Sequence, residues 1–408
     1  MSIENNVAMN AASSPRKTRD LPIPAWKKEK HGSGVRLKRV EKIEEGPRFV
    51  TGSATETSSK HLVNEDHFEI DKRRGIFAVA DGMGSVPAGD VASHEAIGQL
   101  EIDKIDGALA NAKTVKDVKT AELIKSVFDS SKDATLRQND VEDAVSAILL
   151  RMNDEIEELG KTNEDVRTMA KEKTKKLLAL RKIIFDQNNS EHQKLMQDAI
   201  QTIGCTMSLM KTWQNEKSEH MITVGNIGDS RIYRLRNGAL ERLTRDDSHV
   251  QILLDAGIVK NDQDVKEKID ITSVIAFTNK HPELKNLFQD IRENPNDTVA
   301  LGEIRHKLSQ AAGLKTLLKN KFGIDFKPFV RSYDMEDGDA FVVVSDGISD
   351  NLYDEEIRSI VATHFENPQQ IAEELQRVAS KRSKESNKKN ARAKPDDMTA
   401  VAAVFLGE

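Results

Sequence analysis

Four short apolar runs in this chain end or begin at, or within a few residues of, an aspartate. The runs and their aspartates are 76–80 with Asp81, 221–224 with Asp229, 341–345 with Asp346, and 398–402 with Asp396 and Asp397. A short apolar run bounded by turn residues is typical of a buried strand. The aspartates are therefore expected at strand ends, where a rigid backbone can hold a set of ligands in place.

The residue types at these strand ends favour a divalent cation. Gly82 and Gly347 each follow an aspartate, so the main chain could approach an ion closely. Carboxylates from separate strands suit Mg²⁺ or Mn²⁺, which prefer octahedral oxygen coordination. Zinc fits poorly, because the chain has one cysteine and no His pair at ligand spacing. A single Asp-Gly after a strand is usually only a turn, so it is the repetition that indicates a metal site.

The bulk composition places the chain among globular proteins of enzyme size. It has 408 residues, 31% charged and 38% hydrophobic, with a net charge of -6. Dispersed Lys and Arg, outnumbered by acids, argue against nucleic acid, and no apolar run approaches the roughly 20 residues of a membrane span. The N-terminus lacks the apolar core of a secretory signal, and one cysteine favours a reducing compartment. We expect a cytoplasmic monomer, with specialised export left open.

The chain is expected to hold a disordered tail at 1–46 and one domain at 47–408. Strand patterns are expected from 47 to about 100 and at 206–210, 221–227, 231–235, 341–344 and 401–405, with a hairpin turn at Asn237-Gly238. Helices are expected within 117–200, 250–325 and 354–382. Strands and helices are segregated along the chain, which favours an α+β fold.

The order of the motifs resembles that of the metal-dependent protein phosphatases of type 2C, and their bacterial branch most closely. The matching segments are Asn64-Glu65-Asp66, Asp81-Gly82-Met83-Gly84, Gly204-Cys205-Thr206, Gly228-Asp229-Ser230-Arg231, Ser345-Asp346-Gly347 and Asp396-Asp397-Met398-Thr399. They span residues 50–406, so the resemblance covers the domain. It implies a four-layer αββα sandwich of two antiparallel sheets flanked by helices, with helical insertions.

The resemblance also implies a site for two Mg²⁺ or Mn²⁺ ions, with a third ion as an addition. The implied metal ligands are Glu65, Asp66, Asp81, Gly82, Asp229, Asp346 and Asp396. Asp81 would bridge the two ions, Asp346 and Asp396 would hold the first, and these three would be the catalytic residues. The Gly82 carbonyl would complete the second ion, and Asp229 would serve the third. The sequence leaves open which residue of the pair at 65–66 binds metal directly.

In such a site, two cations roughly 3.5–4 Å apart lower the pKa of a bridging water, and the resulting hydroxide attacks phosphorus in line. The expected substrate is phosphoserine or phosphothreonine in a protein. Cysteine-phosphatase chemistry is disfavoured, because Cys205 is followed at the sixth position by Lys211 rather than by Arg. Cys205 is expected to be a small buried strand residue.

Two positions depart from the family pattern near the substrate. His61, preceded by Lys60, stands where the family usually has an arginine that holds the substrate phosphate, and both are predicted to bind phosphate here. Asp397 stands where asparagine is typical, which adds negative charge beside the metals.

Two segments exceed the usual family length. One is a helical insertion at about 162–198, and the other, at about 262–320, lies where a flap beside the active site belongs. The basic loop at 381–394 is expected to be solvated linker. The alternative function is a weakly active pseudophosphatase whose helical insertions bind a protein partner, and a third is a phosphatase of small esters.

Overall fold

The computed structural model describes residues 27–31, 34–38, 49–58, 61, 63–84, 88–130, 134–180, 186, 189–190, 193, 203–260, 271–285, 287–289, 308–323, 325–385 and 392–407. The chain forms two compact units, Met1–Glu45 and Gly46–Glu408. In the first, β1 (Lys27–His31) and β2 (Gly34–Lys38) pair as an antiparallel hairpin inside the tail predicted to be disordered. The two strands, KKEKH and GVRLK, are short and mostly charged, so no apolar alternation marks them in the sequence. The rest of the tail lies outside the described residues.

The larger unit contains two antiparallel sheets of five strands, ordered β10-β7-β6-β5-β4 and β3-β12-β11-β8-β9. The strands are β3 (Phe49–Glu56), β4 (Asp66–Asp71), β5 (Ile76–Asp81), β6 (Met207–Gln214), β7 (His220–Ile227), β8 (Arg231–Arg236), β9 (Ala239–Arg242), β10 (Phe329–Asp334), β11 (Ala340–Val344) and β12 (Met398–Phe405). The predicted α+β class and antiparallel sheets are confirmed.

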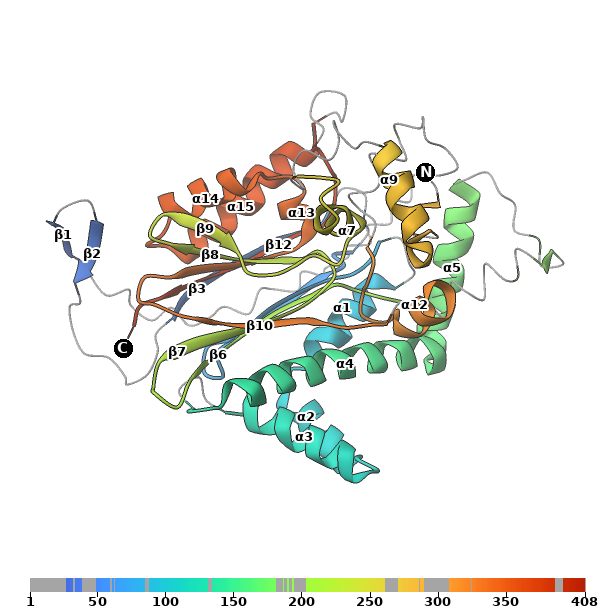
Figure 1. The fold of residues 1–408 in the computed structure, drawn as a ribbon, viewed down its shortest axis with the longest axis horizontal. Coiled ribbons are helices and arrows are strands. Elements are labelled where there is room, and N and C mark those ends of the chain that lie inside the picture. Colours follow the sequence, from blue (N-terminus) through green and yellow to red (C-terminus); the bar gives the residue numbers. More distant parts are fainter. Residues whose placement is uncertain are drawn as a thin grey trace, which may run out of the picture. The chain divides into compact units, whose positions relative to one another are not determined.

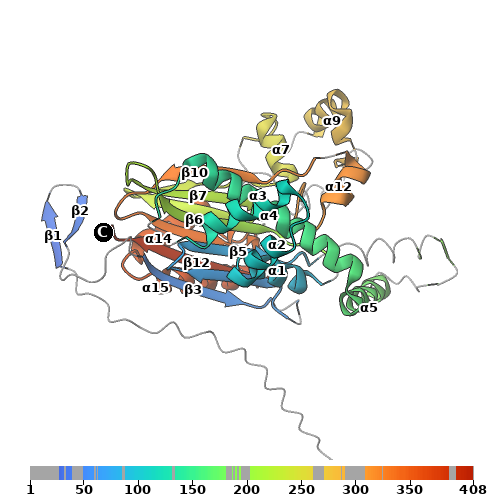
Figure 2. The ribbon, with the colours of Figure 1, turned by 90° about the horizontal axis from the view of Figure 1, so that it is seen from below.

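Helices cover the outer face of each sheet. The α-helices that the structure describes are α1 (Gly89–Gly98), α2 (Ile102–Ala110), α3 (Val115–Phe128), α4 (Gln138–Thr162), α5 (Glu164–Leu180), α7 (His249–Asp255), α9 (Ile271–Lys280), α12 (Lys315–Phe322), α13 (Asp346–Ser349), α14 (Asp354–Thr363) and α15 (Pro368–Ser383). In Figure 1, α13, α14 and α15 lie over one sheet and α4 under the other. Figure 2 shows α1 to α4 together on the sheet that holds β5, β6 and β7.

Three hydrophobic clusters join these four layers. One cluster lies between the first sheet and α1 to α4, and another between the second sheet and α13 to α15. The third lies between the sheets, and includes Phe77, Val79, Ile232 and Phe341. Burying both faces of each sheet explains the nearly continuous apolar runs of β5, β11 and β12, all of whose residues are buried.

Two elements differ from those expected from the sequence. One lies before residue 100, where strands were expected, and the other lies after residue 325, where no strand was expected before 341. Residues 89–98 form helix α1, because their small side chains, including Ala92, Ser93 and Ala96, allow close packing on β4 and β5. Strand β10 was not expected, since it is an edge strand and none of its residues is fully buried. The turn at Asn237-Gly238 is confirmed, with φ of 51° and 81°.

Both extra segments contain helices among their described residues. Helix α5 packs on α4, and residues 181–198 lie almost entirely outside the described part. Helices α7 and α9 share a separate small core that includes Leu253, Val274 and Phe288. This excursion begins and ends at one place on the body, where Ser248 pairs with Leu308.

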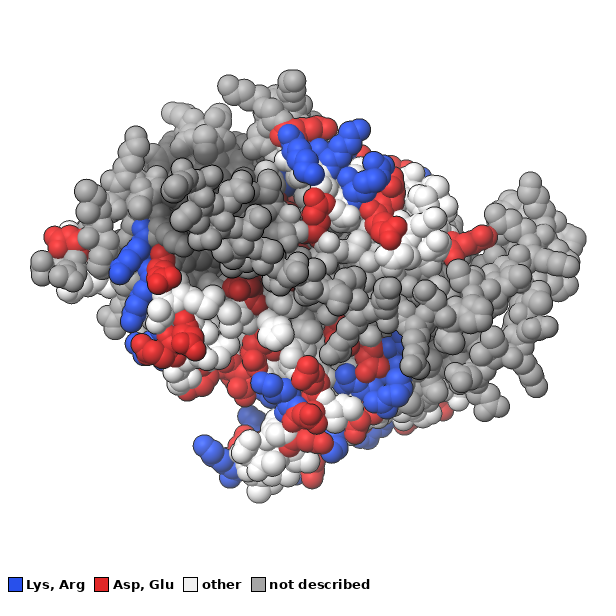
Figure 3. Space-filling model, turned by 180° about the vertical axis from the view of Figure 1, so that it is seen from behind, with Lys and Arg blue, Asp and Glu red and all other residues white. Residues whose placement is uncertain are grey.

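The surface carries both signs of charge. Figure 3 shows Lys and Arg interspersed with Asp and Glu over the described part of one face. Among the described helices, none combines the length and the apolar character needed to cross a bilayer.

Candidate active site

The strand register brings the predicted acidic residues to one end of the two sheets. Asp66 begins β4 and pairs directly with Asp81 at the end of β5. In the other sheet, Val344 of β11 pairs with Ala400 of β12 and with Arg231 of β8. The aspartates at 346, 396 and 229 follow or precede those paired residues by a few positions, so both sheets present acids at the same end.

The backbone at Gly82 lies in a tight cradle. Its N–H donates to the carbonyl of Glu65 at 2.9 Å, and the N–H of Met83 donates to Gly204 at 3.0 Å. A Cβ at Gly82 would lie 2.4 Å from backbone atoms of Gly89. Only glycine fits there, which agrees with the close main-chain approach expected from the sequence.

Burial makes the acidic cluster electrostatically costly. Asp66, Asp81 and Asp229 expose 5%, 9% and 8% of their surface. Burial, reinforced by neighbouring carboxylates, raises the pKa of Asp66 to about 8 and the pKa values of Asp81 and Asp229 well above the usual range. Burial likewise raises the pKa of Asp346, although Lys394 opposes the shift. Such a cluster requires positive charge to be stable at neutral pH.

Within the part of the chain that the structure describes, the side chain of Lys394 brings a positive charge to these carboxylates. The ammonium of Lys394 contacts Asp346 and lies 3.0 Å from an oxygen of Asp350 and 3.0 Å from an oxygen of Asp396. Burial alone would lower the pKa of Lys394, but the surrounding aspartates raise it well above its usual value. Lys394 belongs to the basic loop expected to be solvated linker. That expectation is wrong for its last residues, because Arg392 is also buried.

The side chains fit divalent cations by their chemistry and by their unsatisfied oxygens. Asp66 Oδ1 and Asp346 Oδ1 are buried and have no hydrogen-bond partner among the described residues. Buried carboxylate oxygens normally have donors or bind metal. Within the same residues, no three Asp, Glu, His or Cys side chains converge as a preformed metal-binding group. The acids therefore lie close together with too little positive charge to balance them, and Lys394 lies between Asp346 and Asp396.

The acidic pair at 65–66 is divided between two environments. Asp66 points between the sheets, where Oδ2 accepts from Ser345 at 2.8 Å. Glu65 lies on the side of Gly84 and His61, since a Cβ at Gly84 would be 3.4 Å from both Glu65 Oε2 and His61 Nε2. Asp66 is thus the member of the pair aligned with Asp81.

The two departures from the family pattern contact each other. His61 Nδ1 lies 2.9 Å from Asp397 Oδ2. Asp397 also accepts from the backbone N–H groups of Ser58 at 2.6 Å and Glu65 at 2.7 Å. The bond from Asp397 raises the pKa of His61, although burial opposes it. The predicted phosphate ligand Lys60 lies outside the described residues.

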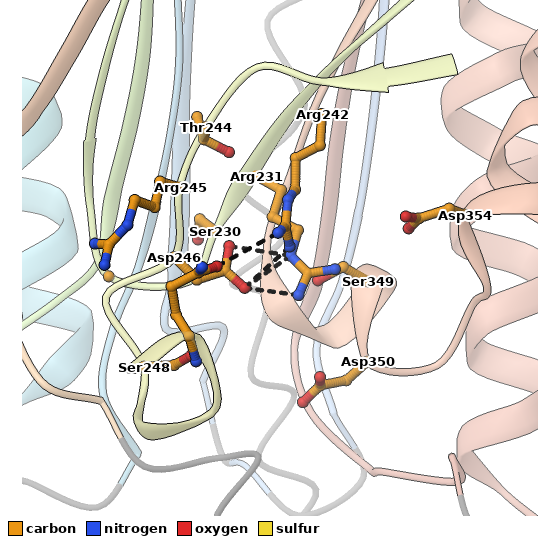
Figure 4. A network of polar contacts seen from close by, with 12 residues as sticks. Ser230, Arg231, Arg242, Thr244, Arg245, Asp246, Ser248, Ser349, Asp350 and Asp354 are labelled. Carbon is orange, nitrogen blue, oxygen red and sulfur yellow. Dashed lines mark hydrogen bonds and ion pairs between the residues drawn. The ribbon is translucent and has the colours of Figure 1, made fainter. Parts of the chain in front are cut away.

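A small cavity adjoins Asp229 and Asp346, and a polar network lines it. Figure 4 shows Arg231 and Arg242 pointing at the carboxylate of Asp246, which is near Ser248. Arg231 donates to Asp246 Oδ2 at 2.6 Å, and Arg242 lies 3.4 Å away. These ion pairs hold the loop after β9, and the charge of Asp246 still contributes to the raised pKa of Asp229.

Sequence reasoning missed three residues near the cluster. These are Asn351, Arg392 and Lys394, which join the turn after β11 to the segment before β12. The one available signal was a lysine two positions before Asp396. Cys205 is fully buried, as expected.

Comparisons with known proteins agree with this architecture. Stp1, a serine/threonine phosphatase of Staphylococcus aureus, has 16% identity and a TM-score of 0.53, with 91% of this chain and 100% of that chain covered. A serine/threonine phosphatase of S. agalactiae has 17% identity and a TM-score of 0.50, with 88% and 99% covered. Among curated proteins no sequence relative was found. The family model for protein phosphatase 2C matches residues 54–389, so the chain belongs to the protein phosphatase 2C family.

Proposed function

We propose that the protein is a Mg²⁺- or Mn²⁺-dependent phosphatase that hydrolyses phosphoserine and phosphothreonine in proteins. The observation that carries this proposal is the buried, under-neutralised set of aspartates at one end of both sheets. Two cations, with a third as an addition, would supply charge neutralisation and a water of lowered pKa. The residues that would hold them are Asp66 or Glu65, Asp81, the Gly82 carbonyl, Asp229, Asp346 and Asp396.

The chain's own residues would bind and orient the substrate. With Nδ1 of His61 engaged by Asp397, Nε2 is the nitrogen that faces the Gly84 side and could donate to a phosphate oxygen. The rigid strand ends at 81 and 346 fix the acids, so little reorganisation is needed during the reaction. A cytoplasmic location and a protein partner on the helical additions belong to the same proposal.

The test is hydrolysis by the purified chain. With Mn²⁺ we expect phosphoserine and phosphothreonine peptides to be hydrolysed faster than nucleotides or small aryl esters, and EDTA to abolish all hydrolysis. Activity that survives EDTA would contradict the metal assignment. Preference for small esters would favour the third candidate function. Calorimetric Mn²⁺ binding without hydrolysis would favour the pseudophosphatase.

The segment at about 262–320 is proposed to select protein substrates. At the end of this segment, where the chain comes back to the body, Leu308 pairs with Ser248 and Ala312 pairs with Cys205. Cys205 in turn pairs with Gly82. Trimming should therefore stay within 262–306, so that this pairing is kept. We expect such trimming to change KM for a phosphopeptide more than KM for an aryl ester. Equal changes would indicate a segment without a role in selection.

A further inference from the structure

Hydrogen bonds fix the backbone of Lys394 beside the acidic cluster, so the position of this residue does not depend on its ion pairs alone. The side chain of Asn351 accepts from the Lys394 N–H at 3.1 Å and donates to the Lys394 carbonyl at 2.8 Å. The same amide donates to the Gly347 carbonyl at 2.8 Å. Asn351 is fully buried. It therefore fixes Lys394 against the turn that carries Asp346.

Arg392 provides a second attachment two residues earlier. Its guanidinium donates to the carbonyls of Ser349 at 2.6 Å and Leu352 at 2.8 Å, and lies 4.5 Å from the ring centre of Tyr353. A Cβ at Gly347 would approach the Asp397 carbonyl to 1.8 Å, so the segment before β12 touches this turn at backbone distance. The position of the Lys394 ammonium is thus built into the fold.

Two of the three carboxylates that Lys394 contacts, those of Asp346 and Asp396, are proposed to hold the first metal ion. Among the described residues, Lys394 is the cation that contacts both Asp346 and Asp396. An ammonium that contacts both carboxylates would stand beside a divalent ion bound to the same two residues, and the two positive charges would repel each other, so they compete for the pair. Without a metal, removing Lys394 would leave two partly buried carboxylates near each other with no counter-charge from this side chain.

We infer that Lys394 is a tethered counter-cation, which neutralises Asp346 and Asp396 in the metal-free protein and must leave them when a divalent cation binds. The inference rests on the proposed function, since it concerns the same carboxylates. It assigns Lys394 a role in setting metal affinity and in stabilising the metal-free protein.

The first experiment compares Lys394→Met with the wild-type chain by calorimetric titration with Mn²⁺. Loss of the competing ammonium should tighten Kd by about tenfold, the effect of one moderate electrostatic contact. Lys384→Met is the matched control, because it removes the same charge from an exposed position. Lys394→Arg keeps the charge and should bind Mn²⁺ no more tightly than the wild type. Unchanged or weaker binding by Lys394→Met would overturn the inference.

Thermal unfolding separates competition from ordinary packing. With EDTA, Lys394→Met should unfold at a lower temperature than the wild type, and with saturating Mn²⁺ the two should nearly coincide. The rise in Tm caused by Mn²⁺ is therefore larger in the variant. An equal loss of stability with and without Mn²⁺ would show a purely structural lysine and would contradict the inference.

Amine labelling of the wild-type chain tests displacement directly and needs no variant. Lys394 should be acetylated slowly in EDTA and faster with Mn²⁺, while the exposed Lys384 should react equally in both. Equal labelling of Lys394 would exclude displacement. If neither the wild type nor Lys394→Met binds Mn²⁺, the proposed function itself fails. If both bind equally well, only the role of Lys394 fails.

Discussion

The two ends of strand β11 carry acidic clusters with opposite electrostatics. At the start, Arg236 donates to Asp339 and Asp334 at 2.6 Å and to Glu336 at 2.7 Å. The side chains of Asp334 and Glu336 are 62% and 58% exposed. The hydrogen bond from Arg236 lowers the pKa of Asp334. At the other end, burial raises the pKa of Asp346.

The difference shows what distinguishes a structural acidic cluster from a reactive one. Both ends combine aspartates with basic side chains, so composition does not separate them. At the Arg236 end, the guanidinium donates to all three carboxylates, and those of Asp334 and Glu336 are also exposed to solvent, so these acids are stable as anions. At the Asp346 end the acids are largely removed from solvent, and Asp66 Oδ1 and Asp346 Oδ1 have no hydrogen-bond donor among the described residues. These carboxylates therefore need a further positive charge to be stable as anions.

The largest expected effect is on catalysis at the Asp346 end. Asp81→Asn or Asp346→Asn should lower kcat by at least about a hundredfold, because each removes a charge that would hold the activating cations. The measurement is phosphopeptide hydrolysis with saturating Mn²⁺. Asp334→Asn is the matched control from the Arg236 end and should retain wild-type kcat. Full activity in Asp81→Asn and Asp346→Asn would remove the distinction between the two ends.

A second prediction concerns the stability of the metal-free protein. The pKa of Asp66 is raised to about 8 in the folded chain, so folding is favoured when this group is protonated. Its contribution is fully present below the unfolded pKa of about 3.9 and is lost as pH rises toward 8. In EDTA, the free energy of unfolding should fall over this range by at most about 1.4 kcal/mol per pH unit, and Tm should fall with it.

Asp66→Asn provides the comparison for that measurement. Asparagine can still accept from Ser345 but does not titrate, so its Tm should decline less between pH 5 and 8. Added Mg²⁺ should flatten the wild-type curve as well. Parallel curves for the two proteins in EDTA would show that Asp66 does not carry the dependence.

A third, smaller effect is expected on substrate binding. Asp397 raises the pKa of His61, so the imidazole stays protonated above its usual pKa of about 6.5 and loses its charge at higher pH. KM should therefore rise severalfold once pH passes the raised pKa. His61→Arg should lower KM and flatten this dependence, and Asp397→Asn should move the rise to lower pH. If His61→Ala leaves KM unchanged from pH 6.5 to 8, His61 does not bind phosphate.

The smallest effect is expected at the Arg236 end. Asp334→Asn removes the ion pairs of an exposed carboxylate with Arg236 and, at 3.9 Å, with Arg234, so stability should fall by less than about 1 kcal/mol, and this difference should shrink at high salt. The lowered pKa of Asp334 places its contribution above pH 4, from which it is lost on acidification. Urea unfolding at low and high salt measures it. A larger, salt-independent loss would make this end a major stabilising element.

Much of the fold was predictable because its central strands are buried on both faces. The runs that end in Asp81 and Asp346 are apolar at nearly every position, a pattern that local sequence shows directly. The edge strand β10 has no such pattern, since its residues are partly exposed. Helix α1 was missed because its small residues are chosen by packing on β4 and β5, which sequence alone does not show.

The site was predictable only in part, for a related reason. Acids at strand ends follow from the strands, but the pairing of His61 with Asp397 joins residues 336 positions apart. The place of Lys394 depends on Asn351, a residue with no local signature. Contacts of this kind are set by tertiary packing rather than by periodicity.

The pairing of Ser248 with Leu308 has a consequence for redesign of the chain. Because the excursion that holds α7 and α9 leaves and re-enters the body at adjacent points and has a small core of its own, its length is only weakly constrained by chain closure. Segments with this geometry suit grafting. A binding domain from another protein could replace the interior of the excursion. The grafted domain would then determine which proteins are brought to the active site.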